Sequence, residues 1–230
     1  MQLRCMEADR GNWPRLDPRD VHVWHLKPDP SGVALNRMRH LSHSERIRCR
    51  GFADPSDRSL YGVAHAGLRL VLARYLDADP ARLCFGKTGN GKPALSGLHG
   101  YAGLCFNLSH SGERVAVAGA RHTPVGVDVE RMRGSPRHVA MAQRFFAAEE
   151  YDFLIRQPVE DQPDTFYRIW TLKEAFGKAL GTGVREPLTL ALADLAAFPR
   201  HELTATVHCA GNRRSELAAA QPIPHELPWG

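Results

Sequence analysis

The most constraining stretch of this sequence is the alternating run Val125-Gly126-Val127-Asp128-Val129-Glu130. Alternation of apolar with polar or small residues is typical of a strand that is buried on one face only. The valines would face a core, which leaves Asp128 and Glu130 on the other face, about 7 Å apart and able to bind one hard cation. Gly126 lacks a side chain and would leave room beside them for a bulky ligand. An amphipathic strand with its charges in solvent fits the same letters.

The chain has 230 residues, of which 43% are hydrophobic and 24% are charged, as in an ordinary globular protein. That length suits one large domain or two small ones. The formal net charge of +5 favours an anionic partner, and a nucleic acid, a phosphorylated cofactor or an acidic protein would each fit. The densest basic cluster, Arg46–Arg50, is short and has no interleaved aromatic residues. We expect a solvated face there and no nucleic-acid partner; nucleic-acid binding through this cluster is a competing interpretation.

The cysteines predict a reducing environment. They are odd in number, lie far apart and form neither a CxxC pair nor a zinc-like spacing, at Cys5, Cys49, Cys84, Cys105 and Cys209. The sequence also has no secretory signal and no apolar run long enough for a membrane span. We therefore expect a cytoplasmic protein with reduced thiols and no membrane partner.

Hydrophobic periodicity predicts an alternation of helices and strands. We expect strands at 21–26, 104–109, 115–119 and 125–130, the last three as a meander, helices at 44–50, 56–76, 139–146, 147–155 and 165–180, later strands at 188–192, 195–198 and 203–208, and irregular ends at 1–20 and 221–230. An N-cap at Ser56 or Asp57 would place Arg58 and Ser59 in a first turn, where free N–H groups favour anions. The glycine-rich loop 86–93 is either a flexible turn or a loop that contacts a phosphate or a base.

Charged residues on the last predicted helix allow two interpretations each. Lys173 falls in the apolar row, where a lysine usually extends its ammonium to solvent, although a cleft that holds an anion also explains it. Glu174 and Lys178 are four residues apart and form either a surface ion pair or part of a site. Ser109 and His110 end a predicted strand, and antiparallel neighbours would bring them towards the surface of Asp128 and Glu130.

Together, these pieces resemble the Sfp-type 4′-phosphopantetheinyl transferases. The matching stretches follow the family order and spacing, and they are Gly91-Lys92-Pro93, Phe106-Asn107-Leu108-Ser109-His110-Ser111, Gly126-Val127-Asp128-Val129-Glu130, Phe145-Phe146-Ala147-(x)-Glu149 and Trp170-(x)2-Lys173-Glu174-Ala175-(x)2-Lys178. The resemblance covers about Glu45 to Gly183. It implies transfer of the phosphopantetheine arm of coenzyme A to a serine of an apo acyl or peptidyl carrier protein, with release of adenosine 3′,5′-bisphosphate.

The resemblance also implies roles for individual residues. Asp128, Glu130 and Glu174 match the family's Mg²⁺ ligands, with Mn²⁺ as a possible substitute, and Glu174 also matches the base for the carrier serine, directly or through water. Lys178 would stabilise the transferring or leaving phosphate, assisted by Lys173. Positions that match the family's coenzyme A contacts are Arg48, Arg58 and Ser59 at the 3′-phosphate, Gly91, Lys92 and Pro93 at the adenine and phosphates, and Ser109 and His110 at the nucleotide phosphates.

The fold expected from the resemblance is α+β, a single-chain pseudo-dimer of two similar α/β lobes with the active site in the cleft between them. Residues 1–122 would form the coenzyme A lobe, and residues 123–230 the lobe with the metal site and the catalytic helix. Such a chain would act as a monomer in activating carrier proteins, for instance in secondary metabolism. The region after the third motif is short for the family, so the second lobe is either smaller or truncated. A non-catalytic module that binds coenzyme A or another nucleotide is the alternative function.

Overall fold

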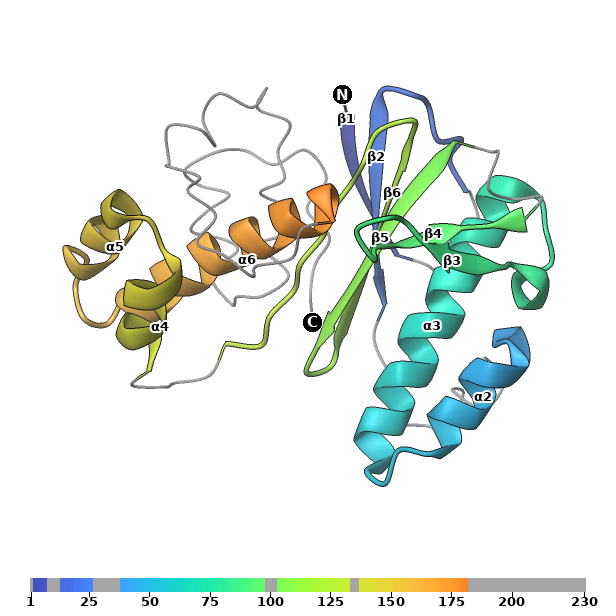
Figure 1. The fold of residues 1–230 in the computed structure, drawn as a ribbon, viewed down its shortest axis with the longest axis horizontal. Coiled ribbons are helices and arrows are strands. Elements are labelled where there is room, and N and C mark those ends of the chain that lie inside the picture. The colour runs from blue at the N-terminus through green and yellow to red at the C-terminus, as the bar shows by residue number, and fades with distance from the viewer. Residues whose placement is uncertain (1, 8–12, 27–37, 98–102, 133–136, 182–230) are drawn as a thin grey trace.

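The computed structural model describes residues 2–7, 13–26, 38–97, 103–132 and 137–181. These residues form a mixed α+β structure in which a four-stranded sheet lies between the long helix α3 and a group of three helices (Figure 1). The elements are β1 Gln2–Glu7, β2 Asp20–Leu26, η1 Met38–His40, α2 His43–Arg50, α3 Pro55–Leu76, η2 Pro80–Arg82, β3 Phe85–Lys87, β4 Pro93–Leu95, β5 Leu104–Ser111, β6 Arg114–Arg121, α4 His138–Phe145, α5 Ala148–Ile155 and α6 Gln162–Leu180. The strands predicted beyond residue 181, and the tail, lie outside the described residues.

The main sheet has the order β1-β2-β6-β5, with β1 parallel to β2 and the other neighbours antiparallel. The prediction that residues 1–20 are irregular is wrong for residues 2–7, which form the edge strand β1. All seven residues of β2 are buried, and β2 takes strand partners on both sides. This burial is typical of a central strand, and β1 supplies one of the two ladders that it requires.

Each face of the sheet has its own apolar core. Leu104 and Phe106 of β5 face α3, where they join a cluster of Trp24, Leu26, Val63, Ala64, Leu68, Val71, Leu72, Val115 and Val117. The opposite face carries Val21, Val23, Ala116, Ala118 and Ala120, and it is covered by Val125, Val127 and Val129. The predicted inward alternation of the valines is therefore confirmed.

Segment 124–132 is nevertheless not a strand of the sheet, so the predicted three-stranded meander is wrong. It runs parallel to β5 and is held by side chains instead of a main-chain ladder. The main-chain N–H groups of Val127, Val129 and Arg131 donate to Asn107 Oδ1, Ser109 Oγ and Ser111 Oγ at 2.9, 3.3 and 3.0 Å. Because every second residue of β5 supplies an acceptor, the segment stays extended on the face of the sheet.

Helix α3 begins earlier than predicted. Its N-cap is Asp54, whose carboxylate accepts the N–H of Ser56 at 2.6 Å, and Pro55 occupies the first turn. The N–H of Arg58 already donates to the carbonyl of Asp54 at 3.0 Å. The predicted cap at Ser56 or Asp57 is therefore wrong, and the N–H of Arg58 is not available to an anion.

Helices α4, α5 and α6 pack around a core of their own, which contains Phe146, Leu154, Phe166 and Ile169. Phe146 and Phe166 stack with ring centroids 5.3 Å apart. The side chain of Leu180 is 50% exposed, because the C-terminal turn of α6 leaves this core and reaches the sheet (Figure 1). Among the described helices none has the length and apolar character needed to cross a membrane.

Candidate active site

Asp128 lies at the junction between segment 124–132, β5 and α6. Its side chain is buried, and its Oδ1 accepts hydrogen bonds from Ser109 Oγ at 2.9 Å and from Lys178 Nζ at 2.5 Å. Lys178 Nζ also contacts Ser109 Oγ at 3.1 Å, so the three side chains form one closed cluster. A charge-assisted hydrogen bond this short indicates a strong interaction between Lys178 and the carboxylate.

The second carboxylate oxygen of Asp128 has no hydrogen-bond partner although it is buried. A buried carboxylate oxygen without a partner is costly, and such an atom calls for a ligand. Glu174 and Glu130 lie near enough for their charges to act on one another, and Ser111 Oγ donates to Glu130 at 2.9 Å. Burial, and then the charge of Asp128, raise the pKa of Glu174; Glu130 adds to this rise and Lys178 opposes it.

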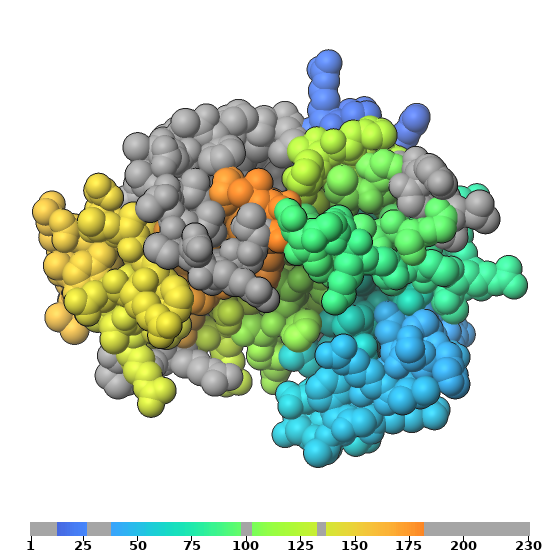
Figure 2. All heavy atoms as spheres, in the orientation of Figure 1, coloured from blue at the N-terminus to red at the C-terminus, as the bar shows by residue number. Residues whose placement is uncertain are grey.

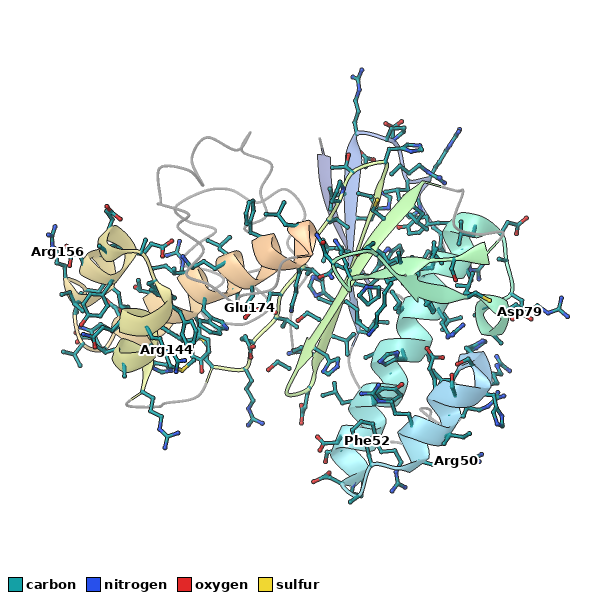
Figure 3. All side chains as sticks on the ribbon, viewed as in Figure 1. Arg50, Phe52, Asp79, Arg144, Arg156 and Glu174 are labelled. Carbon is teal, nitrogen blue, oxygen red and sulfur yellow. The ribbon has the colours of Figure 1, made fainter. Side chains whose placement is uncertain are left out.

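This donor set suits a hard divalent cation. Mg²⁺ binds through one or two carboxylates and keeps waters or phosphate oxygens as its other ligands, so it needs no closed protein cage. No group of three or more acidic, histidine or cysteine ligands is preassembled among the residues that the structure describes. A cation would give the unpartnered oxygen of Asp128 a ligand, and it would offset the electrostatic repulsion between Glu174 and its neighbouring acids. Figure 3 labels Glu174 on α6, on the side of the helix that turns towards segment 124–132.

Gly126 positions α6, and it does not leave room for a ligand as predicted. A Cβ built on Gly126 would meet the carbonyl oxygen of Ala175 at 1.8 Å and the nitrogen of Ala179 at 2.6 Å. The backbone of α6 therefore occupies the space that a side chain at position 126 would need. This close approach brings the turn that carries Lys178 directly onto the segment that carries Asp128.

Lys173 has a different partner from the one expected. Its ammonium donates to Glu150 Oε2 at 2.7 Å and lies 5.8 Å from the ring centroid of Phe146. The side chains of Lys173 and Glu150 are 2% and 0% exposed. The anion that explains a lysine in the apolar row is thus Glu150 of the same chain, and in this structure Lys173 is not directed at the Asp128 cluster.

The residues matched to the 3′-phosphate lie on the other side of the molecule's central sheet, on α2 and α3. Arg48 is exposed, with its guanidinium 5.7 Å from the ring centroid of Tyr61. Arg58 is exposed and donates through Nε and Nη2 to the carbonyl of Phe52 at 3.3 and 2.8 Å. Ser59 is half-buried beside it. In Figure 2 the surface is hollowed between the α2–α3 half and the α4–α6 half.

The glycine-rich loop joins β3 to β4. Gly91 has φ +80°, in the left-handed region that favours glycine, and Pro93 is the first residue of β4. Lys92 Nζ donates to the carbonyls of Val125 and Ala179 at 2.8 and 3.1 Å. Burial lowers the pKa of Lys92. The ammonium predicted to contact coenzyme A is therefore bound to main-chain carbonyls of segment 124–132 and α6.

Ser109 and His110 separate at the end of β5. The Ser109 hydroxyl is buried in the Asp128 cluster, whereas His110 is exposed. Partial loss of water, and then the charges of His65 and Lys178, lower the pKa of His110. His65 stacks on Tyr61 with ring centroids 4.1 Å apart, and the other neighbour of the Tyr61 ring is the guanidinium of Arg48 on α2.

Several residues of the site were not predicted. Asn107 and Ser111 hold segment 124–132, and their signal is the polar alternation of β5, in which Asn107, Ser109 and Ser111 share one face. Glu150 pairs with Lys173 and also accepts the N–H of Ala147 at 2.8 Å. An acid three residues after a helix start is a capping signal, but nothing in the sequence pairs it with Lys173.

Two family models cover most of the chain. Residues 26–122 match the N-terminal model of 4′-phosphopantetheinyl transferase, and residues 124–224 match the 4′-phosphopantetheinyl transferase superfamily. The resemblance stated from the sequence motifs is thereby confirmed.

Individual relatives agree with these matches. The 4′-phosphopantetheinyl transferase HetI of Nostoc sp. is 34% identical over 167 residues, which are 72% of this chain and 70% of that protein. A 4′-phosphopantetheinyl transferase of Bacillus subtilis is 33% identical over 72% of this chain and 71% of its own length. The transferase psf-1 of Bacillus pumilus is 38% identical over 71% and 69%. This chain, with its acidic cluster at the junction of sheet and helix, belongs to the 4′-phosphopantetheinyl transferase family.

Proposed function

We propose that this enzyme transfers the 4′-phosphopantetheine arm of coenzyme A to a serine hydroxyl of an apo acyl or peptidyl carrier protein, and releases adenosine 3′,5′-bisphosphate. The observation that carries the proposal is the buried, unpartnered oxygen of Asp128 beside Glu174 and Lys178, in a chain of this family. A module that only binds a nucleotide needs neither a base nor a cation at this place.

The proposed cation ligands are Asp128, Glu130 and Glu174. They would hold Mg²⁺, or Mn²⁺ in its place, which neutralises charge on the diphosphate of coenzyme A when bound. Three contacts support this assignment: Gly126 admits the backbone of α6, Ser109 donates to Asp128, and Ser111 donates to Glu130.

Glu174 is the proposed base, directly or through a water. Its place beside Asp128 and Lys178, in the motif that matches the family's base, supports this role. The serine proton goes to the carboxylate, the serine oxygen bonds to the phosphorus that bears the pantetheine arm, and the diphosphate P–O bond breaks. The electron pair of that bond leaves with adenosine 3′,5′-bisphosphate.

Lys178 is the proposed phosphate-stabilising cation. In the structure its ammonium is shared between Asp128 and Ser109, and its side chain is 28% exposed. An ammonium has three donor hydrogens, so Lys178 can keep a contact with Asp128 and still donate to a phosphate oxygen. Lys173 is enclosed with Glu150, so we assign it a role in holding α5 against α6 in place of direct phosphate contact.

Coenzyme A recognition is assigned to the exposed cations of the first half of the chain. Arg48 and Arg58, with Ser59, would hold the 3′-phosphate, and His110 would contact the nucleotide phosphates. Gly91 and Pro93 would line the adenine through the backbone of their loop. Ser109 would act on the site through Asp128, to which its hydroxyl donates.

The net charge of +5 would speed encounter with an acidic carrier protein and change the chemistry little. Residues 1–122 and 123–230 are proposed as two lobes of a monomeric pseudo-dimer, with the active site in the cleft between them. A role in secondary metabolism in the cytoplasm fits this assignment. Among the described residues, the thiols of Cys49, Cys84 and Cys105 are free.

Mass spectrometry of apo carrier proteins tests the function. Incubation with the enzyme should add the mass of one phosphopantetheine arm, and omission of either coenzyme A or Mg²⁺ should abolish the gain. A panel of fatty-acid, polyketide and peptide carriers would define the substrate. If coenzyme A binds tightly and no carrier on the panel gains mass, the protein is a non-catalytic binding module.

A further inference from the structure

The loop between β3 and β4 contacts the C-terminal end of α6, from which it is separated by about ninety residues of sequence. The loop is internally hydrogen-bonded: Thr88 N–H donates to the Lys92 carbonyl and Gly91 N–H to the Thr88 carbonyl, each at 2.8 Å. Asn90 and Lys92 would lie 3.3 and 3.5 Å from a Cβ on Gly181, the C-cap of α6, which has φ +77°. Loop and helix end are therefore packed in direct contact.

Lys92 contributes the charged part of this contact. Its ammonium donates to the Ala179 carbonyl in the last turn of α6 and to the Val125 carbonyl of segment 124–132. Carbonyls in the last turn of a helix have no partner within the helix and carry its partial negative charge. One cation thus satisfies two main-chain acceptors on two elements and ties them together.

The two elements are those that carry the reacting groups. Ala179 follows Lys178 directly, and Val125 precedes Gly126, whose missing side chain admits the backbone of α6. A shift of the helix end relative to segment 124–132 would open the contact between Lys178 and Asp128. Placement errors of about 1 Å at a reacting group cost up to about 100-fold in rate.

We propose that Lys92 is a positioning residue, which clamps the C-terminal end of α6 to segment 124–132 and so sets the geometry of Lys178 and Asp128. This inference rests on the proposed function and changes the role that the resemblance gives to Lys92, which is direct contact with coenzyme A. The two roles differ in what is lost when the ammonium is removed. A clamp supports turnover, whereas a phosphate contact supports binding of coenzyme A.

The test compares Lys92→Met, which keeps the length of the side chain, with Lys92→Arg, which restores donors, and with Lys87→Met. Lys87 is an exposed lysine of the same hairpin and serves as the matched control. For each variant, kcat is measured with an apo carrier, and the Kd for coenzyme A by calorimetry. We expect Lys92→Met to lower kcat about 10- to 100-fold with a Kd within about twofold of wild type. Lys92→Arg should recover most of the rate, and Lys87→Met should match wild type.

Hydrogen exchange of the amides in the last turn of α6 gives a second readout that needs no carrier and also applies to a weakened fold. Lys92→Met should speed exchange at residues 177–181 far more than in the aromatic core of α4–α6. Unchanged exchange there, unchanged kcat, or a loss confined to the Kd for coenzyme A would each overturn the clamp. If the wild-type chain modifies no carrier, the proposed function fails, and the exchange measurement still decides the clamp.

Discussion

Helix α6 forms two lysine–carboxylate pairs, and they differ mainly in their access to solvent. Lys173 pairs with Glu150 at 2.7 Å, with side chains 2% and 0% exposed, whereas Lys178 pairs with Asp128 at 2.5 Å, with side chains 28% and 3% exposed. In each pair one carboxylate oxygen is buried and has no hydrogen-bond partner. The two lysines lie five positions apart in the sequence, which places them about 140° apart around the helix. The helix thus presents the same chemistry to two different environments.

The environments decide what each pair can do. The Lys173 pair is enclosed beside Phe146 and Phe166, so neither charge can be solvated if the other is removed. The Lys178 pair opens to the surface through the lysine and has Glu174 and Glu130 as neighbours. We call Lys173–Glu150 the enclosed pair and Lys178–Asp128 the open pair. The enclosed pair can only stabilise the fold, whereas the open pair, with its neighbouring acids, can also bind a cation and a phosphate.

The largest expected effect is on activity at the open pair. Asp128→Asn keeps the size of the side chain and its acceptor for Ser109, but it removes the charge that binds the cation and Lys178. We expect the transfer rate to fall about 1000-fold with little change in the thermal midpoint. The exposed residue Asp152 provides the control Asp152→Asn, which should retain full activity. Near wild-type turnover by Asp128→Asn would remove Asp128 from the reaction.

The enclosed pair should show its effect in stability. Lys173→Met leaves the Glu150 carboxylate buried without its cation, and we expect the free energy of unfolding in denaturant to drop by about 3–5 kcal/mol. The double variant Lys173→Met with Glu150→Leu should recover much of the loss, because both charges are then absent. A loss below about 1 kcal/mol in the single variant would show that the pair is not enclosed.

Gly126→Ala probes the contact that connects α6 to the open pair. The added methyl group would meet helix backbone at 1.8 Å, so the helix must shift. We expect a cost of about 1–3 kcal/mol in unfolding free energy, together with a clear loss of turnover. Gly89→Ala is the matched control, because nothing lies within 4 Å of its added Cβ. If Gly126→Ala behaves like Gly89→Ala, segment 124–132 and α6 are not in close contact.

The smallest expected effect is a change in the pKa of Glu174, which lies beside the open pair. In the metal-free protein, burial, Asp128 and Glu130 raise the pKa of Glu174 above its ordinary 4.5, whereas a bound cation would favour the ionised carboxylate and lower this pKa again. The pKa of Glu174 is higher in the folded than in the unfolded state. Ionised Glu174 therefore destabilises the fold when the pH is above the folded-state pKa, and this destabilisation disappears when the pH falls below the unfolded-state pKa.

Carbon NMR of the Glu174 carboxyl in metal-free protein measures the shift. Glu130→Gln removes one repelling charge and should lower the pKa of Glu174 towards the ordinary value. As a control, Glu149→Gln at an exposed position should leave the pKa of Glu174 unchanged. An unchanged Glu174 pKa in Glu130→Gln would place the two acids too far apart to share a cation.

Much of the fold followed from local pattern. The long helices, the β5–β6 pair and the inward valines of 125–129 were predicted, because amphipathic period and turn residues specify them locally. The extended segment 124–132 was mistaken for a strand, because an alternating pattern reports burial and not the identity of the hydrogen-bond partner. Here the acceptors are side chains of Asn107, Ser109 and Ser111.

The contacts between residues of the candidate site were predicted less well than the local structure. Asp128 and Lys178 meet as the motifs suggested, but the partner of Lys173 is twenty-three residues earlier in the chain, and that of Lys92 is a pair of main-chain carbonyls. Such long-range contacts depend on how the elements pack. The same holds for Gly126, where a ligand and a helix backbone are equally good reasons for a missing side chain.

Binding of Mn²⁺ in the presence of coenzyme A, followed by electron paramagnetic resonance, tests most directly whether the open pair of α6 is the cation site. We expect wild type and Asp152→Asn to bind the ion with equal affinity, and Asp128→Asn to lose at least about tenfold. Equal affinity in all three proteins would contradict the assignment of Asp128 and leave its buried oxygen without a ligand.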